Sequence, residues 1–233
     1  MARITKEYDE RLTEFLDTAQ QLFFEKGYEK TSVNEIIEKM GVAKGTFYYY
    51  FKTKSDLLDK LVQRFAERVK SEITKLVERT DLSAIEKLNG AFALGRTIKA
   101  ENIELMKLLL KVLYTDNNLI LRHRIIRSKI KITIPLFVKI LEQGNREGSF
   151  HVDDSREVAE LIYIVGASLN EIVCELILKA SDNPEIFEEI NRKIKVYERS
   201  VEKILGITPG SITVADHEFI KLFKIENNNK KGG

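Results

Sequence analysis

The chain has 233 residues, and its 38 Lys+Arg against 36 Asp+Glu give a formal net charge of +2. Hydrophobic residues make up 43% and charged residues 32%, a soluble globular composition that can bury a core without disulfides or metals. These values exclude a disordered polyelectrolyte and a fibrous repeat, and the overall charge gives no indication of nucleic-acid binding.

The compartment follows from the cysteine content and the apolar runs. Cys174 is the single cysteine and cannot form an internal disulfide, which favours a reducing compartment. The N-terminus is charged from residue 3 and lacks the apolar core of a signal peptide. The longest uncharged apolar-rich run, 161–170, is too short to cross a bilayer. We therefore expect a cytoplasmic protein without a membrane partner.

The first part of the chain predicts one long and two short helices. Apolar residues recur with helical period from Tyr8 to Phe23, and Gly27 ends this helix. Ser32 and Glu35 form the capping box of a second, short helix that Gly41 ends. A third short helix is expected over 44–51.

The rest of the chain predicts longer helices. Thr53 is expected to cap a helix over about 54–79, and either Asp81 or Ser83 begins the next segment. Helical pattern resumes over about 101–115 and 118–147, where Pro135 is expected to kink or divide the helix. We expect Gly144 and Gly148 to close that helix. Asp153 or Asp154 is expected to cap the next helix, which runs to about 180. Asn183-Pro184 is expected to start a last long helix that Gly206 ends.

No stretch alternates with a period of two, so the predicted fold is all-α with nine or ten helices. We divide it into a helix-turn-helix domain (1–53), a helical regulatory and dimerisation domain (54–205) and a C-terminal extension (206–233). In the extension, residues 219–223 form one short amphipathic turn, and the polar end from Glu226 is expected to be disordered.

The region 39–55 carries the functional signal. Two short helices joined by a glycine-containing turn match the helix-turn-helix pattern, whose second helix enters the DNA major groove. The region contains four lysines and no Asp or Glu, whereas residues 1–60 as a whole sum to a charge of −1. Tyr48, Tyr49 and Tyr50 offer hydroxyls, while Val42, Phe47 and Phe51 are expected to face inward.

The run from Leu16 to Leu58, with the string GVAKGTFYYYFKTKSDLL, resembles the DNA-binding domain of the TetR family of transcriptional regulators. The resemblance implies contacts to base edges from Lys44, Gly45, Thr46 and Tyr48. It implies contacts to the DNA backbone from Thr31, Ser32, Tyr49, Tyr50 and Lys54. The chain departs from the family pattern in having Ala43 where Ser is common and Tyr50 where His is common, which alters the contacts there. A role in core packing is the alternative for each of the three tyrosines, above all for Tyr50, but all three cannot be buried together.

The rest of the chain resembles the family more loosely. The last two long helices correspond to those that commonly form the family's four-helix dimer interface, and the helix after 154 is more apolar than one buried stripe requires. We therefore expect a homodimer that reads a palindromic operator in double-stranded DNA.

By the same resemblance, a small-molecule effector would bind among the middle helices, about 82–147. Candidate lining residues, for each of which core packing is the alternative, are Phe92, Leu109, Leu113, Tyr114, His123, Ile126 and Phe137. An anionic or lipid-like ligand is one hypothesis, because residues 118–141 carry cations without acids: Arg122, Arg124, Arg127, Lys129, Lys131 and Lys139.

The predicted function is that of a ligand-responsive repressor. An enzyme is disfavoured because the three histidines are scattered and no metal, cofactor or phosphate-loop motif occurs. The remaining alternative is a helix-turn-helix protein whose helical body mainly binds another protein.

Overall fold

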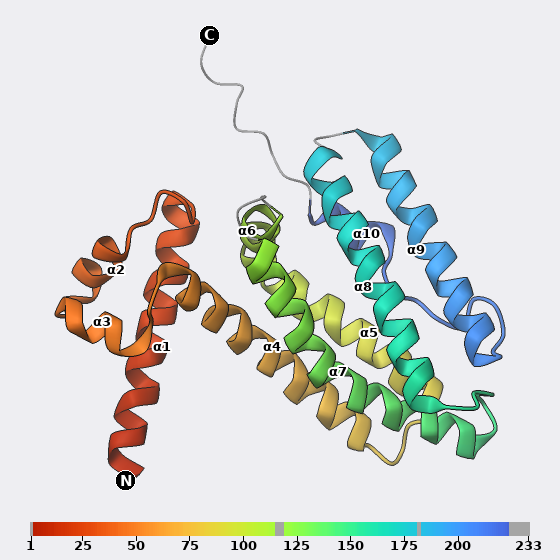
Figure 1. Ribbon diagram of the computed structural model, residues 1–233. Helices are drawn as coiled ribbons and strands as arrows, with labels where there is room; N and C mark the ends of the chain where they lie inside the picture. The colour runs from red at the N-terminus through yellow and green to blue at the C-terminus, as the bar shows by residue number, and fades with distance from the viewer. Residues whose placement is uncertain (1, 115–118, 181–182, 224–233) are drawn as a thin grey trace.

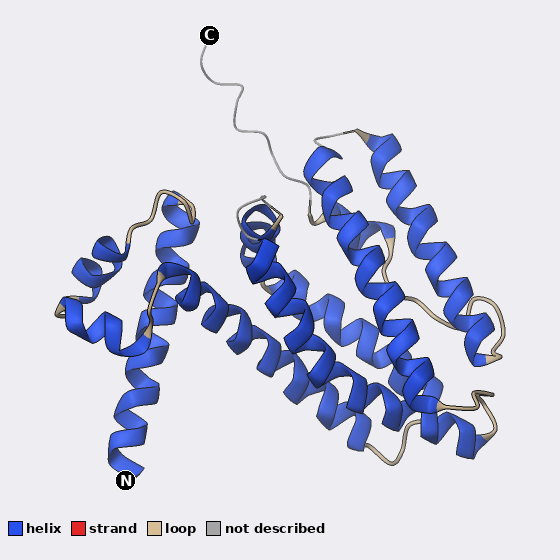
Figure 2. Cartoon of the chain, in the orientation of Figure 1, coloured by secondary structure: helices blue, strands red, loops and turns tan. Residues whose placement is uncertain are grey.

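The computed structural model describes residues 2–114, 119–180 and 183–223, and this part of the chain contains helices and no strand (Figures 1 and 2). The all-α prediction is confirmed. The helices are α1 (Ala2–Lys26), α2 (Val33–Met40), α3 (Lys44–Tyr50), α4 (Lys54–Glu78), α5 (Ala84–Glu101), α6 (Ile103–Leu113), α7 (Leu119–Glu147), α8 (Ser155–Ala180), α9 (Pro184–Leu205) and α10 (His217–Lys221).

Local capping explains where several helices begin. Ser32 and Ser83 each form a complete capping box, which decides between Asp81 and Ser83 in favour of the serine. Thr53 accepts a hydrogen bond from the N–H of Asp56, and Asp154 accepts from the second and third residues after it. Asn183 caps α9 with Pro184 at its first position, so these predicted starts are confirmed.

The structure narrows two predictions about α7. Of the two alternatives for Pro135, division of the helix is wrong, because the helix continues from Leu119 to Glu147 with Pro135 inside it. Of the two glycines expected to close the helix, Gly144 lies inside it, whereas Gly148, with a φ of +71°, directly follows its last residue, Glu147. Gly144 is required for packing: a Cβ there would lie 2.0 Å from the Phe150 ring.

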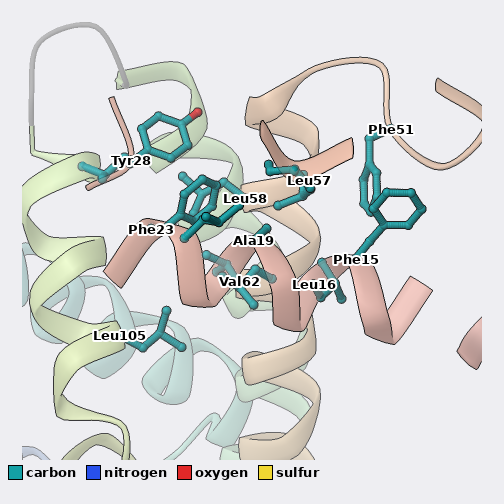
Figure 3. Close-up of a cluster of buried hydrophobic side chains, with 14 of the residues drawn as sticks. Phe15, Leu16, Ala19, Phe23, Tyr28, Phe51, Leu57, Leu58, Val62 and Leu105 are labelled. Atoms are coloured by element: carbon teal, nitrogen blue, oxygen red, sulfur yellow. The ribbon is translucent and has the colours of Figure 1, made fainter. Parts of the chain in front are cut away.

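The N-terminal lobe consists of α1, α2 and α3, and α4 runs from this lobe into the helical body (Figure 1). Its buried cluster combines α1 residues such as Phe15 and Phe23 with Leu57 and Leu58 of α4 and Leu105 of α6 (Figure 3). Part of α6 therefore belongs to the core of the lobe. Any movement of α4 or α6 relative to α1 changes this shared core.

Residues 211–214, in the segment after α9, are held against α5 and α9 by hydrogen bonds. Buried Glu202 and Glu198 on α9 accept hydrogen bonds from the backbone N–H groups of Ile212 (3.0 Å) and Val214 (2.7 Å). Asn89 on α5 binds the same segment through Ser211 and Thr213. The predicted short turn near 219–223 corresponds to α10, whereas the end predicted to be disordered, from Glu226, lies outside the described residues.

Candidate nucleic-acid interface

The start of α2 is fixed against α1 by an ionic capping box. The exposed Ser32 accepts a hydrogen bond from the N–H of Glu35 (3.2 Å), and the N–H of Ser32 donates to the Glu35 carboxylate (2.7 Å). Lys26 at the end of α1 pairs with this carboxylate at 2.6 Å. The hydrogen bonds from Lys26 and Ser32 lower the pKa of Glu35 to about 2. The Ser32 hydroxyl is thereby held at an exposed edge of the lobe.

Helix α3 presents one side to the core and the other to solvent. Phe47 is fully buried, with its ring centroid 5.9 Å from that of Phe15 and 5.4 Å from that of Phe51. Tyr48 and Tyr49 are 50% and 74% exposed. Because successive helical residues point about 100° apart, burying Phe47 turns its two neighbours outward. The predicted inward direction of Phe47 and Phe51 is confirmed.

The exposed start of α3 combines a cation with an unobstructed backbone. Lys44 is exposed and its Nζ lies 5.9 Å from the Tyr48 ring centroid. A Cβ at Gly45 would meet no protein atom within 4 Å, although glycine costs about 1 kcal/mol in a helix relative to alanine. Packing within the lobe therefore does not account for Gly45. Close approach of an external group does account for it.

Tyr50 mainly attaches α3 to α1. Its ring is half-buried, stacks on Tyr8 with 4.7 Å between ring centroids, and lies tilted against the Phe15 ring at 5.4 Å. Burial is the largest cause of the raised pKa of Tyr50. Tyr8 was assigned to the apolar stripe of the first helix, yet it lies at the edge of this aromatic cluster, 6.0 Å from Tyr49. Helical period alone does not predict a contact between Tyr8 and the tyrosines of α3.

The structure does not support the phosphate contact expected of the Thr31 side chain. Thr31 is 1% exposed, and its hydroxyl donates inward to the carbonyls of Gly27 (2.8 Å) and Leu22 (3.3 Å). A hydroxyl directed at these carbonyls closes the turn between α1 and α2. The sequence pattern did not predict this burial, because Thr31 directly precedes the exposed N-cap residue Ser32 and was expected to share its exposure.

Lys54 is likewise directed inward and not toward a DNA backbone. Its Nζ donates to the carbonyls of Tyr28 (2.7 Å) and Thr31 (2.9 Å), and more weakly to that of Glu29 (3.4 Å). It also lies 4.3 Å from the Tyr28 ring centroid, and burial lowers the pKa of Lys54. The lysine therefore connects the first residue of α4 to the turn that precedes α2.

The positive patch is smaller than the four lysines of region 39–55 indicate. Lys39 pairs with Glu25 at 3.5 Å, and Lys54 is directed into the turn. Lys44 and Lys52 are exposed and have no ion pair with any described residue. These two lysines lie on either side of the exposed tyrosines in the sequence.

The candidate effector residues do not gather in one place. Leu109 and Leu113 belong to the cluster of the N-terminal lobe, Phe92 and Phe137 pack in a second cluster, and Tyr114 packs against a third. His123 is exposed, and the side chain of Ile126 lies outside the described residues. The helical period of the sequence shows that a residue is on an apolar face, but not in which of the three clusters it packs. The predicted grouping is thus incorrect for the residues from α6.

The cations of α7 also differ in environment. Arg122 pairs with Glu171 at 3.1 Å, whereas Arg127, Lys131 and Lys139 are exposed. The side chains of Arg124 and Lys129 are not among those described. A hollow of about 430 Å³ at the end of α4 includes Lys139 but none of the seven candidate lining residues.

Helix α8 carries an exposed apolar face. Leu161, Ile164, Val165 and Ile172 are 45–55% exposed, and Val196 on α9 is also exposed. By length and composition alone α8 could cross a membrane, although it packs between α7 and α9 (Figure 1). Gly166 allows α9 to approach, because a Cβ there would lie 2.7 Å from the Tyr197 hydroxyl. Exposure of so many large aliphatic side chains indicates a surface that another molecule covers.

The chain is similar in sequence to known proteins. Residues 15–61 match the family described as "Bacterial regulatory proteins, tetR family". The chain is 27% identical over 158 residues to the HTH-type transcriptional repressor KstR2 of Mycobacterium tuberculosis, covering 66% of this chain and 76% of the relative. It is 44% identical over 62 residues to the HTH-type transcriptional regulator AcrR of Shigella flexneri, covering 26% and 29%.

The fold is also known from a crystal structure. A putative TetR-family transcriptional regulator from Syntrophomonas wolfei superposes with a TM-score of 0.59 and 24% identity, over 86% of this chain and 100% of that one. At this identity the likeness describes the fold alone.

Proposed function

Because the chain belongs to the TetR family of transcriptional regulators, we propose that it is a cytoplasmic repressor that binds a palindromic operator as a homodimer. A small-molecule effector releases it from the DNA. We also retain the division into domains 1–53, 54–205 and 206–233 as a proposal.

The observation that carries this proposal is the two-sided arrangement of α3. Phe47 anchors the helix in the core, while Tyr48, Tyr49 and Lys44 are exposed and belong to the stretch 39–55, which contains no Asp or Glu. The recognition helix of a helix-turn-helix domain needs one buried side and one exposed polar side. The buried side holds the helix in a fixed position while the polar side chains reach base edges.

The proposed contacts follow the exposure of each residue. Lys44, Gly45, Thr46 and Tyr48 are assigned to base edges and adjacent phosphates, and Ser32 and Tyr49 to the DNA backbone. Thr31, Tyr50 and Lys54 hold the reading surface in position and are assigned no direct contact through their own side chains.

The homodimer is supported by the exposed apolar face of α8. Aliphatic side chains exposed to this extent favour a second copy of the chain over water, and an isologous contact gives the two-fold symmetry that a palindrome requires. A small-molecule effector shifts the operator affinity only to the extent that it binds the free and operator-bound conformations unequally.

The test is selection of DNA followed by footprinting. The full-length protein is incubated with a random duplex pool, and the enriched duplex is then footprinted with wild type, Tyr48→Ala and an exposed control on the same helix as Lys54, Lys60→Met. We expect a protected palindrome with wild type and the control, and a loss of affinity of about tenfold or more with Tyr48→Ala. Enrichment of no sequence would contradict the proposal and favour a role in binding another protein.

The oligomeric state is measured separately by sedimentation. Ile164→Arg places a charge on the exposed face of α8, where the wild-type side chain is 55% exposed. We expect a dimer for wild type and a monomer for the variant, with the same helix content. A monomeric wild type at micromolar concentration would contradict the homodimer.

A further inference from the structure

Two buried carboxylates on α9 accept backbone hydrogen bonds from the segment that follows this helix. Glu198 and Glu202 are 3% and 2% exposed and lie about one turn apart. They accept from the N–H groups of Val214 at 2.7 Å and Ile212 at 3.0 Å, and Glu198 also pairs with Lys195 at 2.7 Å. A buried carboxylate is unfavourable for folding unless such donors satisfy it. The position of the segment after α9 is therefore linked to the stability of α9.

Helix α5 holds the same segment through two further side chains. Asn89 donates to the carbonyl of Ser211 at 2.7 Å and accepts from the N–H of Thr213 at 3.1 Å. Arg96 lies about two turns further along α5 and donates to the carbonyls of Thr213 at 2.8 Å and Val214 at 3.0 Å. Side chains of α5 and α9 thus satisfy the backbone of a segment that has no helix or strand of its own.

The segment also joins two buried clusters of the helical body. Ile212 is buried in the cluster to which α4, α5, α7, α8 and α9 contribute. Ala215 is buried in the cluster that contains Leu110 of α6. Ile220 of α10 belongs to this second cluster, and α10 packs on α9 (Figure 1). We call residues 211–220 the C-terminal clamp, because they hold these helices together.

Helix α6 connects the clamp to the N-terminal lobe. Leu105 and Leu109 are buried in the cluster of the lobe, together with Phe23 of α1. Leu110, the next residue, is buried in the cluster that includes Ile220 of the clamp. Successive helical residues point about 100° apart, so α6 packs on the lobe with one side and in the clamped cluster with another. Because both clusters are closely packed, a shift of α6 changes both of them.

We propose that the C-terminal clamp is a regulatory element that fixes α6 and thereby sets the position of the N-terminal lobe for operator binding. While the clamp is docked, α6 keeps its place between the two clusters. When the clamp loosens, α6 and the lobe occupy more positions, and operator binding must first order them. This inference rests on the proposed function, because it names how the affinity for the operator is regulated.

The first experiment measures backbone hydrogen exchange in the full-length protein without DNA. Arg96→Met and Asn89→Ala each remove two hydrogen bonds to the clamp. We expect both variants to raise exchange in the clamp by about fivefold or more, to raise exchange in α6 as well, and to leave α2 and α3 as in wild type. Ser83→Ala is the matched control, because it removes the N-cap of the same helix and its hydrogen bonds are with Glu86. It should leave exchange in the clamp and in α6 unchanged.

The second experiment measures affinity for the duplex that wild type selects. We expect Arg96→Met and Asn89→Ala to weaken binding by about fivefold or more, as for coupled sites, with the wild-type salt dependence because no phosphate contact is lost. Ser83→Ala should keep the wild-type affinity. Coupling is reciprocal, so the duplex should in turn slow exchange in the wild-type peptide that contains Ile212 and Val214. This last measurement needs no variant.

The proposal is overturned if exchange in α6 stays unchanged when the clamp is loosened, or if the clamp variants bind the operator as tightly as wild type or more tightly. It is also overturned if the duplex leaves exchange in the clamp unchanged. An equal loss of affinity in Ser83→Ala would overturn it too, because general destabilisation would then explain the effect. If wild type selects no duplex, the proposed function fails, and the exchange data without DNA still decide whether the clamp fixes α6.

Discussion

The inward position of Lys54 gives a prediction that separates two roles of a lysine near DNA. Lys54→Met removes two good charge-assisted hydrogen bonds, at 2.7 and 2.9 Å, and a cation–π contact at 4.3 Å. A hydrogen bond to a charged group contributes about 1.5–3 kcal/mol, but the exposed part of the side chain can rebind water. We therefore expect the free energy of unfolding to fall by about 2–3 kcal/mol.

The assay is the dependence of operator affinity on salt, measured by fluorescence anisotropy with the duplex that wild type selects. Losing one phosphate contact per subunit reduces the slope of log K against log salt by about 0.9, or about 1.8 for a dimer. We expect Lys44→Met to show this reduction. We expect Lys54→Met to weaken binding by about tenfold with the wild-type slope, because it displaces the start of α2 without removing a phosphate contact.

The conservative variant Lys54→Arg provides the control for folding, since a guanidinium can donate to the same carbonyls and stack on Tyr28. It should restore both stability and affinity. If Lys54→Met reduced the slope of log K against log salt as much as Lys44→Met does, the positioning role would be refuted. Lys54 would then be a residue that contacts DNA phosphate directly.

Three further predictions test the packing and the ionic cap. Phe47→Ala should destabilise the fold by about 3–5 kcal/mol, whereas Tyr48→Ala should leave the melting temperature nearly unchanged; equal losses would contradict their opposite burial. Gly144→Ala should destabilise by about 1–3 kcal/mol or more because its Cβ meets the rigid Phe150 ring, and denaturant unfolding that matches wild type would contradict this packing. Because the pKa of Glu35 is lowered from 4.5 to about 2 in the folded state, its stabilisation is complete above pH 4.5 and is lost as the pH falls toward 2. The difference in melting temperature between wild type and Glu35→Gln should therefore shrink over this interval, and a constant difference would contradict the ionic cap.

The sequence by itself determined the features that depend on neighbours within one or two helical turns. The capping boxes of Ser32 and Ser83, the Asn183-Pro184 start and the ends at Gly41 and Gly206 form from residues a few positions apart. The opposite directions of Phe47 and its tyrosine neighbours follow from the helical period. These local interactions were sufficient for the all-α fold and for the reading helix.

Tertiary structure decided what each side chain meets across the chain. Lys54 contacts a carbonyl 26 residues earlier, and Thr31 one nine residues earlier, so neither could be assigned from local pattern. The sequence specifies local conformation through short-range contacts, whereas the environment of a charge depends on surfaces that only the assembled helices bring together.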